Sequence, residues 1–183
     1  MRYFIMSADD RIRGRVEPIG ISEAVANEMS GEGLTHNLEN INLQIPIKSQ
    51  DSVEYVDWIE RPIPLVSDSL KQLLTKIAPD VKVAPLVLAD MKKLRQDVYW
   101  IIAPPRIDCL SLKTEFLKDG TLKRLVIDNR KASRPIFQIK GIREKYTFVN
   151  LAVAESILRR SYSGIKLRKV ENEVESSGMM SSP

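Results

Sequence analysis

Few residues of this sequence could perform chemistry, and their spacing does not assemble them into a catalytic motif. His36 is the only histidine, and it lies in Leu-Thr-His-Asn-Leu without an acid or a nucleophile beside it. A lone histidine of this kind is more often a surface or packing residue than a general base or a metal ligand. The only cysteine, Cys109, follows Asp108 in an apolar stretch, which predicts a small buried core residue and excludes an internal disulfide.

Other motifs for catalysis or metal binding are also missing from the sequence. Residues 31–33, Gly-Glu-Gly, lack the third glycine, the lysine and the preceding strand of a phosphate-binding loop. Carboxylates are paired at Asp9 and Asp10 and again at Asp90 and Asp97, but acids in such places are usually turn residues. We therefore expect no enzyme activity, no cofactor and no metal, although a hydrolase that uses only carboxylates would escape a motif search.

Residues for binding a partner are easier to identify. Trp and Tyr give large contact areas at a small entropic cost, so Trp58 and Tyr99 are candidates for contacts with a partner, with core packing as the alternative. From Val98 to Ile102 alternate residues face opposite sides of a strand, and we expect Trp100 in the core and Tyr99 at the surface. Ordinary solvated surface charge is the alternative for the basic candidates. These basic candidates are Arg143, Lys145, Arg159 and Arg160.

The clearest structural unit that could position these residues runs from Pro64 to Ala103. Apolar residues at i, i+3, i+4 and i+7 predict an amphipathic helix over about residues 68–78, with Ser67 as its N-cap and Pro79 as its end. Strand-like runs at 81–89 and 98–103 flank the polar residues 90–97, which predicts a hairpin. The helical stripe consists of Leu70, Leu73, Leu74 and Ile77.

The flanking regions have weaker patterns. An apolar strand is expected at residues 3–6, and the frequent turn residues over about 7–50 predict an irregular region with a possible short helix at 22–29. Residues 41–47 alternate as a half-buried strand does, and Pro46 favours an edge position. Asp119-Gly120 predicts a second hairpin, followed by a strand at 135–140.

A similar order of residues occurs again near the C-terminus. Val66-Ser67, a helix and Val81-Lys-Val83 correspond to Val149-Asn150, a helix and Ile165-Lys-Leu167. Asn150 is the expected cap of this second helix, and Gly164 is the residue expected to end it. The match is short, so an internal duplication and a coincidence of common helix signals both remain open.

Length and composition place these elements in one domain. With 183 residues, of which 43% are hydrophobic and 28% charged, the chain can form one well-buried core. We expect a single α+β domain over residues 1–170, with a mostly antiparallel sheet and two short amphipathic helices packed on it. Residues 171–183 contain three Glu, no Lys or Arg and little apolar surface, which predicts a disordered tail. No apolar run suits a membrane span or a signal peptide, so we expect a cytoplasmic protein.

The order of these signals resembles a known family. The order begins with Tyr-Phe-Ile near the N-terminus and Val-Asp-Trp-Ile, and it continues through Pro-Leu-Val-Ser-Asp-Ser-Leu-Lys-Gln-Leu-Leu to Val-Tyr-Trp-Ile-Ile and a closing Val-Asn helix with Ser-Gly-Ile-Lys-Leu. This order is similar to that of the bacterial immunity proteins of polymorphic toxin systems that were first catalogued as a domain of unknown function and named after a myxobacterial member. The resemblance covers most of residues 50–169 and rests on packing motifs. Asn150 stands where that family usually has Ser.

The resemblance implies a protein that binds and neutralises a cognate toxin by stoichiometric occlusion. Because the formal net charge is +4, we expect an acidic toxin surface, and we expect no membrane, nucleic acid or small-molecule substrate as partner. The alternative is a basic nucleic-acid-binding or regulatory module without catalysis, for which retention on heparin or DNA is the discriminating observation. The toxin's identity, the binding surface and the oligomeric state are not encoded in any recognisable pattern.

Overall fold

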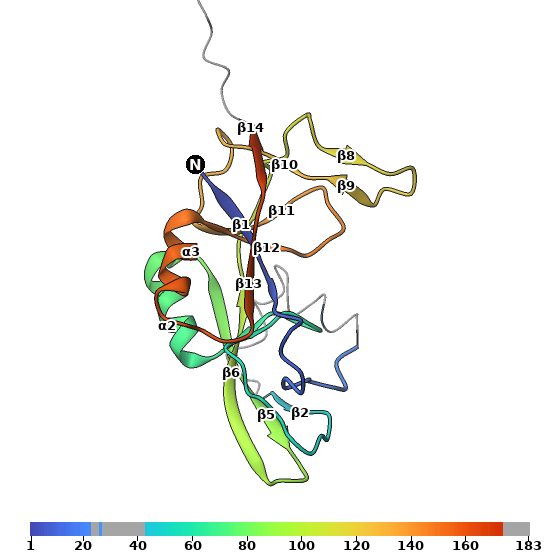
Figure 1. Cartoon of the computed structure of the whole chain (residues 1–183), viewed down its shortest axis with the longest axis vertical. Coiled ribbons are helices and arrows are strands. Elements are labelled where there is room, and N and C mark those ends of the chain that lie inside the picture. The colour runs from blue at the N-terminus through green and yellow to red at the C-terminus, as the bar shows by residue number, and fades with distance from the viewer. Residues whose placement is uncertain (23–25, 27–42, 174–183) are drawn as a thin grey trace, which may run out of the picture.

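The computed structural model describes residues 1–22, 26 and 43–173, which form an α+β fold (Figure 1). The predicted fold class is confirmed, because two short helices accompany strands that pair mostly antiparallel. Two five-stranded sheets contain most of the strands, and both helices lie on the same side of the molecule in Figure 1. Within the described residues, no helix combines the length and the apolar character that crossing a membrane requires.

One sheet is built around the predicted hairpin and has the strand order β2-β5-β6-β4-β3. β4 and β5 each pair antiparallel with β6, so α2 is a crossover between two parallel strands that flank β6. Residues 58–103 of this sheet are called the first unit below. The elements are β2 (Gln44–Pro46), β3 (Trp58–Ile59), β4 (Leu65–Val66), α2 (Asp68–Ile77), β5 (Lys82–Asp90) and β6 (Arg95–Ala103).

The other sheet has the order β13-β1-β12-β11-β7 and repeats this topology. β12 and β13 flank β1 and are antiparallel to it, and α3 connects them as α2 connects β4 and β5. Residues 3–8 and 136–169 are called the second unit below. Its sheet contains β1 (Tyr3–Ala8), β7 (Arg106–Ile107), β11 (Ile136–Ile139), β12 (Thr147–Asn150) and β13 (Ile165–Lys169), with α3 at Leu151–Leu158.

The strand registers align the central strand and its two neighbours in one unit with those in the other. Val83 lies opposite Ile102 in the first unit, and Leu167 lies opposite Met6 in the second. The four residues 99–102, Tyr-Trp-Ile-Ile, therefore correspond to residues 3–6, Tyr-Phe-Ile-Met. The topology thus extends the repeat seen in the sequence to the central strand of each sheet.

The two equivalent tyrosines also make equivalent hydrogen bonds. Tyr99 donates its hydroxyl proton to the backbone carbonyl of Val56 (2.8 Å), and Tyr3 donates to that of Ala132 (2.6 Å). Each acceptor lies in the segment that leads into the outer strand of the unit, β3 or β11. Each tyrosine therefore fixes the same kind of connection while its ring remains in the core.

Three apolar clusters form the core, and the middle one joins the units. It contains the buried faces of both helices together with residues of both sheets. The opposite faces of the sheets contribute to separate clusters, with Tyr99 and Ile101 in one and Tyr3 and Ile5 in the other. The helical residues of the middle cluster are Leu70, Leu73, Leu74, Val153, Ala154 and Ile157.

The helices begin where the sequence predicted, but one of them ends elsewhere. Ser67 accepts a hydrogen bond from the N–H of Leu70, and Asn150 accepts one from that of Val153, so both predicted N-caps are confirmed. α3 ends at Leu158, and Gly164 lies beyond it, directly before β13. The prediction that Gly164 ends the second helix is therefore wrong.

The C-terminal side is more ordered than the sequence predicted. β14 (Glu171–Glu173) pairs parallel with β10 (Val126–Asp128), so the expectation of disorder from residue 171 is wrong for these three residues. The hairpin predicted at Asp119-Gly120 is present as β8 (Glu115–Phe116) and β9 (Leu122–Arg124). β2 is an edge strand, as Pro46 indicated. Of the predicted helix at 22–29, Ser22 and Ala26 alone are described, and positions 41–42 of the predicted strand also lie outside the described residues.

Candidate functional site

A cleft of about 880 Å³ lies where β1 ends and the segment after β3 passes the irregular residues 15–21. It is lined by backbone and side chains of both units and of the segment that follows β1. Charged side chains reach it from three places along the chain, which makes it a candidate binding surface rather than a gap in the core. Its charged lining residues are Asp10, Arg15, Glu17, Glu60 and Arg61.

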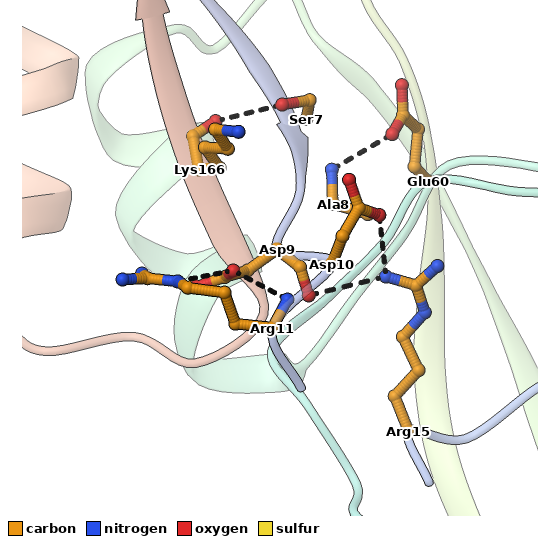
Figure 2. A network of polar contacts seen from close by, with 8 residues as sticks. All are labelled: Ser7, Ala8, Asp9, Asp10, Arg11, Arg15, Glu60 and Lys166. Carbon is orange, nitrogen blue, oxygen red and sulfur yellow. Dashed lines mark hydrogen bonds and ion pairs between the residues drawn. The ribbon is translucent and has the colours of Figure 1, made fainter. Parts of the chain in front are cut away.

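A network of polar contacts fixes the wall of this cleft (Figure 2). The N–H of Ala8 donates to Glu60 Oε2 (2.9 Å), which ties the end of β1 to the segment after β3. Arg15 Nη1 lies 3.7 Å from Asp10 Oδ1 and donates to the carbonyl of Asp9 (3.4 Å). The cleft wall is therefore held by charge-assisted contacts, one of which joins segments that are 52 positions apart in the sequence.

Asp9 anchors the turn that follows β1. Its carboxylate accepts from Arg11 Nε (2.9 Å), from Arg11 Nη2 (2.7 Å) and from the Arg11 N–H (3.1 Å). The side-chain hydrogen bond from Arg11 is the main reason that the pKa of Asp9 falls to about 2. Asp9 is thus ionised at neutral pH, and it holds the turn that carries Asp10 into the cleft.

A second hollow of about 440 Å³ adjoins the cleft, because residues 60–62 and Ile21 line both. This hollow contains Arg143 and Lys145, two of the basic residues that the sequence singled out, with Glu144 between them. Glu144 accepts from the N–H of Leu122 through Oε1 (3.1 Å), while its buried Oε2 has no hydrogen-bond partner among the described residues. The cleft and this hollow are called the groove below.

The described residues that line the groove include four acidic and four basic side chains. A polyanion such as a nucleic acid needs a predominantly positive track, whereas a folded polypeptide offers charges of both signs. The groove therefore suits a protein surface better than a nucleic acid backbone. Its described charged residues are Asp10, Glu17, Glu60 and Glu144 with Arg15, Arg61, Arg143 and Lys145.

Reactive groups elsewhere in the described structure do not form a second candidate site. Cys109 is fully buried, and burial raises its pKa to about 12, so its thiol is protonated and inaccessible at neutral pH. Within residues 1–22, 26 and 43–173, no three His, Cys, Asp or Glu side chains are placed to hold a metal ion. His36 lies outside the described residues. No family model matches the chain, and no curated protein matches it.

The aromatic residues predicted to contact a partner are buried instead. Trp58 is 1% exposed and Tyr99 is 4% exposed, so the prediction of a binding role on the surface is wrong for both. Trp100 has the more open position, the reverse of the expectation. Lys71 Nζ lies 3.9 Å from the centre of its ring, and its Nε1 donates to Asp68 Oδ1 (3.0 Å).

The four basic candidates are exposed, but the structure divides them between two places. Arg143 and Lys145 lie in the groove, on the side of the second sheet that faces away from α3. Arg159 and Arg160 lie just after α3, where Arg159 pairs with Glu155 (3.5 Å) and Arg160 donates to the carbonyl of Ser156 (3.0 Å). They therefore do not form one basic surface.

The groove also contains charged residues that the sequence did not single out as a site. Arg15 stood in a run of alternating basic residues, and Arg61 stood between an acid and a proline. Neither pattern indicates that the two side chains line one cleft. The end of β1 meets the segment after β3 only in the tertiary fold, through the contact between Ala8 and Glu60. Glu60 had no signal in the sequence at all.

Proposed function

We propose that this protein is an immunity protein that binds a cognate bacterial toxin in the cytoplasm and neutralises it by stoichiometric occlusion. The sequence resemblance to immunity proteins over most of residues 50–169 supports this proposal. The groove supplies the observation that carries it, since its paired charges fit a protein surface. No covalent chemistry by this chain is required, because the bound protein itself covers the toxin.

The rigidity of the groove favours tight binding. Asp9, Arg15 and Glu60 are held by contacts within the chain, so they lose little conformational freedom when a partner binds. Arg61 and Arg143 are exposed and have no hydrogen-bond or ion-pair partner among the described residues. Arginines in such positions are frequent anchors in protein interfaces. These two residues are therefore our candidates for the contacts that contribute most to affinity.

The charge of the chain indicates the kind of surface that the toxin presents. The net charge is +4, and both candidate anchors are cationic. We expect the toxin to place carboxylates against Arg61 and Arg143, and we expect association to slow as salt is added. The alternative, a nucleic-acid-binding module, predicts retention on heparin at physiological salt, which the mixed charge of the groove disfavours.

We expect a secreted protein with a toxic C-terminal domain to be encoded beside this chain, and the test uses that domain. Co-expression with this protein should restore growth of cells that produce that domain, and the purified pair should form a complex that light scattering can size. Growth arrest that persists in spite of co-expression, with no complex between the purified proteins, would contradict the proposal.

A charge-reversal pair locates the binding surface. Arg143→Glu should weaken the complex at least about tenfold, because a cation at the centre of an interface becomes a repelling anion. The matched control is Arg160→Glu, which makes the same change at an exposed position after α3, outside the groove. Calorimetric titration of both variants checks this, and equal losses in the two would argue against the groove.

A further inference from the structure

The comparison of the two units identifies residues 86–98 as an extension without a counterpart. β5 and β6 match β13 and β1 only as far as Pro85 and Tyr99, where β13 ends and β1 begins. Beyond that point the first unit continues as a hairpin that forms the lower end of the molecule in Figure 1. The base of this hairpin packs on β2 and contributes Leu86 and Leu88 to the core. Residues 91–94, called the hairpin tip below, lie beyond it.

The hairpin tip is fixed in one conformation by the residues at its base. Asp90 is 3% exposed, and its Oδ1 accepts from the N–H groups of Lys92 and Lys93, both at 3.0 Å. On the other strand, Arg95 pairs with Asp97 (2.7 Å), and its guanidinium lies over the ring of Tyr55 at 3.7 Å. The tip is therefore preorganised, and a partner that binds it does not have to order it.

Leu94 occupies this tip with a strained backbone and an exposed side chain. Its φ of 52° lies in the left-handed region, which glycine and asparagine adopt readily and leucine does not. Its side chain is 88% exposed, so it gains nothing from burial in the core. Met91, at the other end of the tip, is also exposed. Strain and exposure that coincide at one residue indicate a role outside folding.

The charges around the tip point to the chemistry of its partner. Asp90 accepts hydrogen bonds from backbone N–H groups and Asp97 accepts from Arg95. The side chains of Lys92 and Lys93 instead contact Asp51, an exposed residue of a neighbouring loop. Surface ion pairs of this kind contribute little and are easily exchanged. The tip therefore presents two apolar side chains flanked by available cations.

We propose that the hairpin tip inserts Leu94 and Met91 into an apolar pocket rimmed by carboxylates on the partner protein. This inference rests on the proposed function and names a contact surface of the same complex. Insertion buries the two side chains that the free protein leaves in water, while Lys92 and Lys93 meet the carboxylates at the rim. Two apolar side chains on a four-residue turn suit a pocket in a protein rather than the interior of a membrane.

Replacing Leu94 distinguishes this proposal from a structural role, because the Tm and the affinity for the partner should change in opposite directions. Leu94→Gly removes the strain at φ 52° and should raise the Tm by about 2 °C. The same change removes the inserted side chain and should weaken binding to the C-terminal domain of the neighbouring secreted protein at least about tenfold. Differential scanning calorimetry and calorimetric titration measure the two quantities on the full chain.

The control is Leu112→Gly, which removes another fully exposed leucine from a different surface and should leave affinity unchanged. If Leu94→Gly binds that domain as the wild type does, the tip proposal is overturned while the proposed function stands. If the wild type does not bind the domain, both fall. Binding of the wild type, but not of Leu94→Gly, to phosphatidylglycerol vesicles would assign the tip to a lipid surface and overturn the proposal as well.

Discussion

The two units share one topology but obtain their central strand in different ways. In the first unit, β6 follows β5 directly through a hairpin, so the strand and both of its neighbours lie within residues 65–103. In the second unit, the central strand is β1, which pairs with β12 and β13 from the other end of the chain. The same sheet is thus assembled from local contacts in one half and from distant contacts in the other.

This difference separates what the fold requires from what it tolerates. Both units place Tyr, an aromatic residue, Ile and an apolar residue on the central strand. We infer that this pattern is needed to form and pack the sheet. The direct connection between the central strand and its neighbour is dispensable, since the second unit lacks it. The long hairpin is likewise not needed to form such a sheet, which is why its tip stands out as a functional addition.

The largest effect is expected from removing the equivalent isoleucines of the two central strands. Ile5 and Ile101 are 2% and 0% exposed, so Ile5→Ala and Ile101→Ala should each lower the free energy of unfolding by about 4 kcal/mol. The kinetics should differ, because local contacts form earlier than distant ones. Ile101→Ala should mainly slow folding, and Ile5→Ala should mainly accelerate unfolding. Stopped-flow measurements in urea distinguish these outcomes, and identical kinetics would remove the distinction between the units.

A smaller effect is expected at Gly164, whose equivalent in the first unit is Asp80. A Cβ at Gly164 would lie 2.8 Å from Val56 Cβ and 2.9 Å from the Trp58 carbonyl oxygen, at a φ of +80°. Gly164→Ala should therefore cost about 3 kcal/mol, of which the backbone conformation alone accounts for about 1 kcal/mol. Gly20→Ala is the matched control, since Gly20 has the same φ and, among the described residues, no atom within 4 Å of such a Cβ. Equal losses in a urea titration would show that the crowding has no effect.

The smallest effect concerns the loss of stability at acid pH. Several carboxyl groups have a pKa below the ordinary value because of hydrogen bonds they accept, and all lie outside residues 58–103. Such groups stabilise the fold above their unfolded pKa of about 4, and this contribution is lost as the pH falls through the lowered folded value. Between pH 4 and pH 2, amide exchange should accelerate in β8, β9, β10 and β14, which carry or flank four of these groups, before it does so in the first unit. The opposite order would be evidence against this account. The groups are Asp9, Glu115, Asp119, Asp128 and Glu173.

The sequence predicted the parts of the fold that depend on local signals. The leucine stripe of α2, the caps Ser67 and Asn150 and the turn at Asp119-Gly120 each involve residues within one or two turns of one another. β14 could not be found in this way, because Glu171, Asn172 and Glu173 have no apolar pattern. Their pairing with β10 is supported by distant partners such as Arg124, which donates to Glu171 (2.7 Å).

The candidate site was only partly predictable for a related reason. Alternation along β6 indicated that Tyr99 and Trp100 face opposite sides, but both sides of this strand are covered by core clusters. The sequence could not show which side is covered more completely. Arg143 and Lys145 were identified by charge alone, whereas the groove around them is formed by chain segments that only the tertiary fold brings together.

The position of β1 also governs how the protein is made. Tyr3 and its hydrogen-bond acceptor Ala132 are 129 positions apart, and β12 and β13 lie further still along the chain. During translation the ribosome releases the Tyr-Phe-Ile-Met segment long before any strand that could cover it. This apolar segment must therefore stay exposed without aggregating until almost the whole domain has been synthesised.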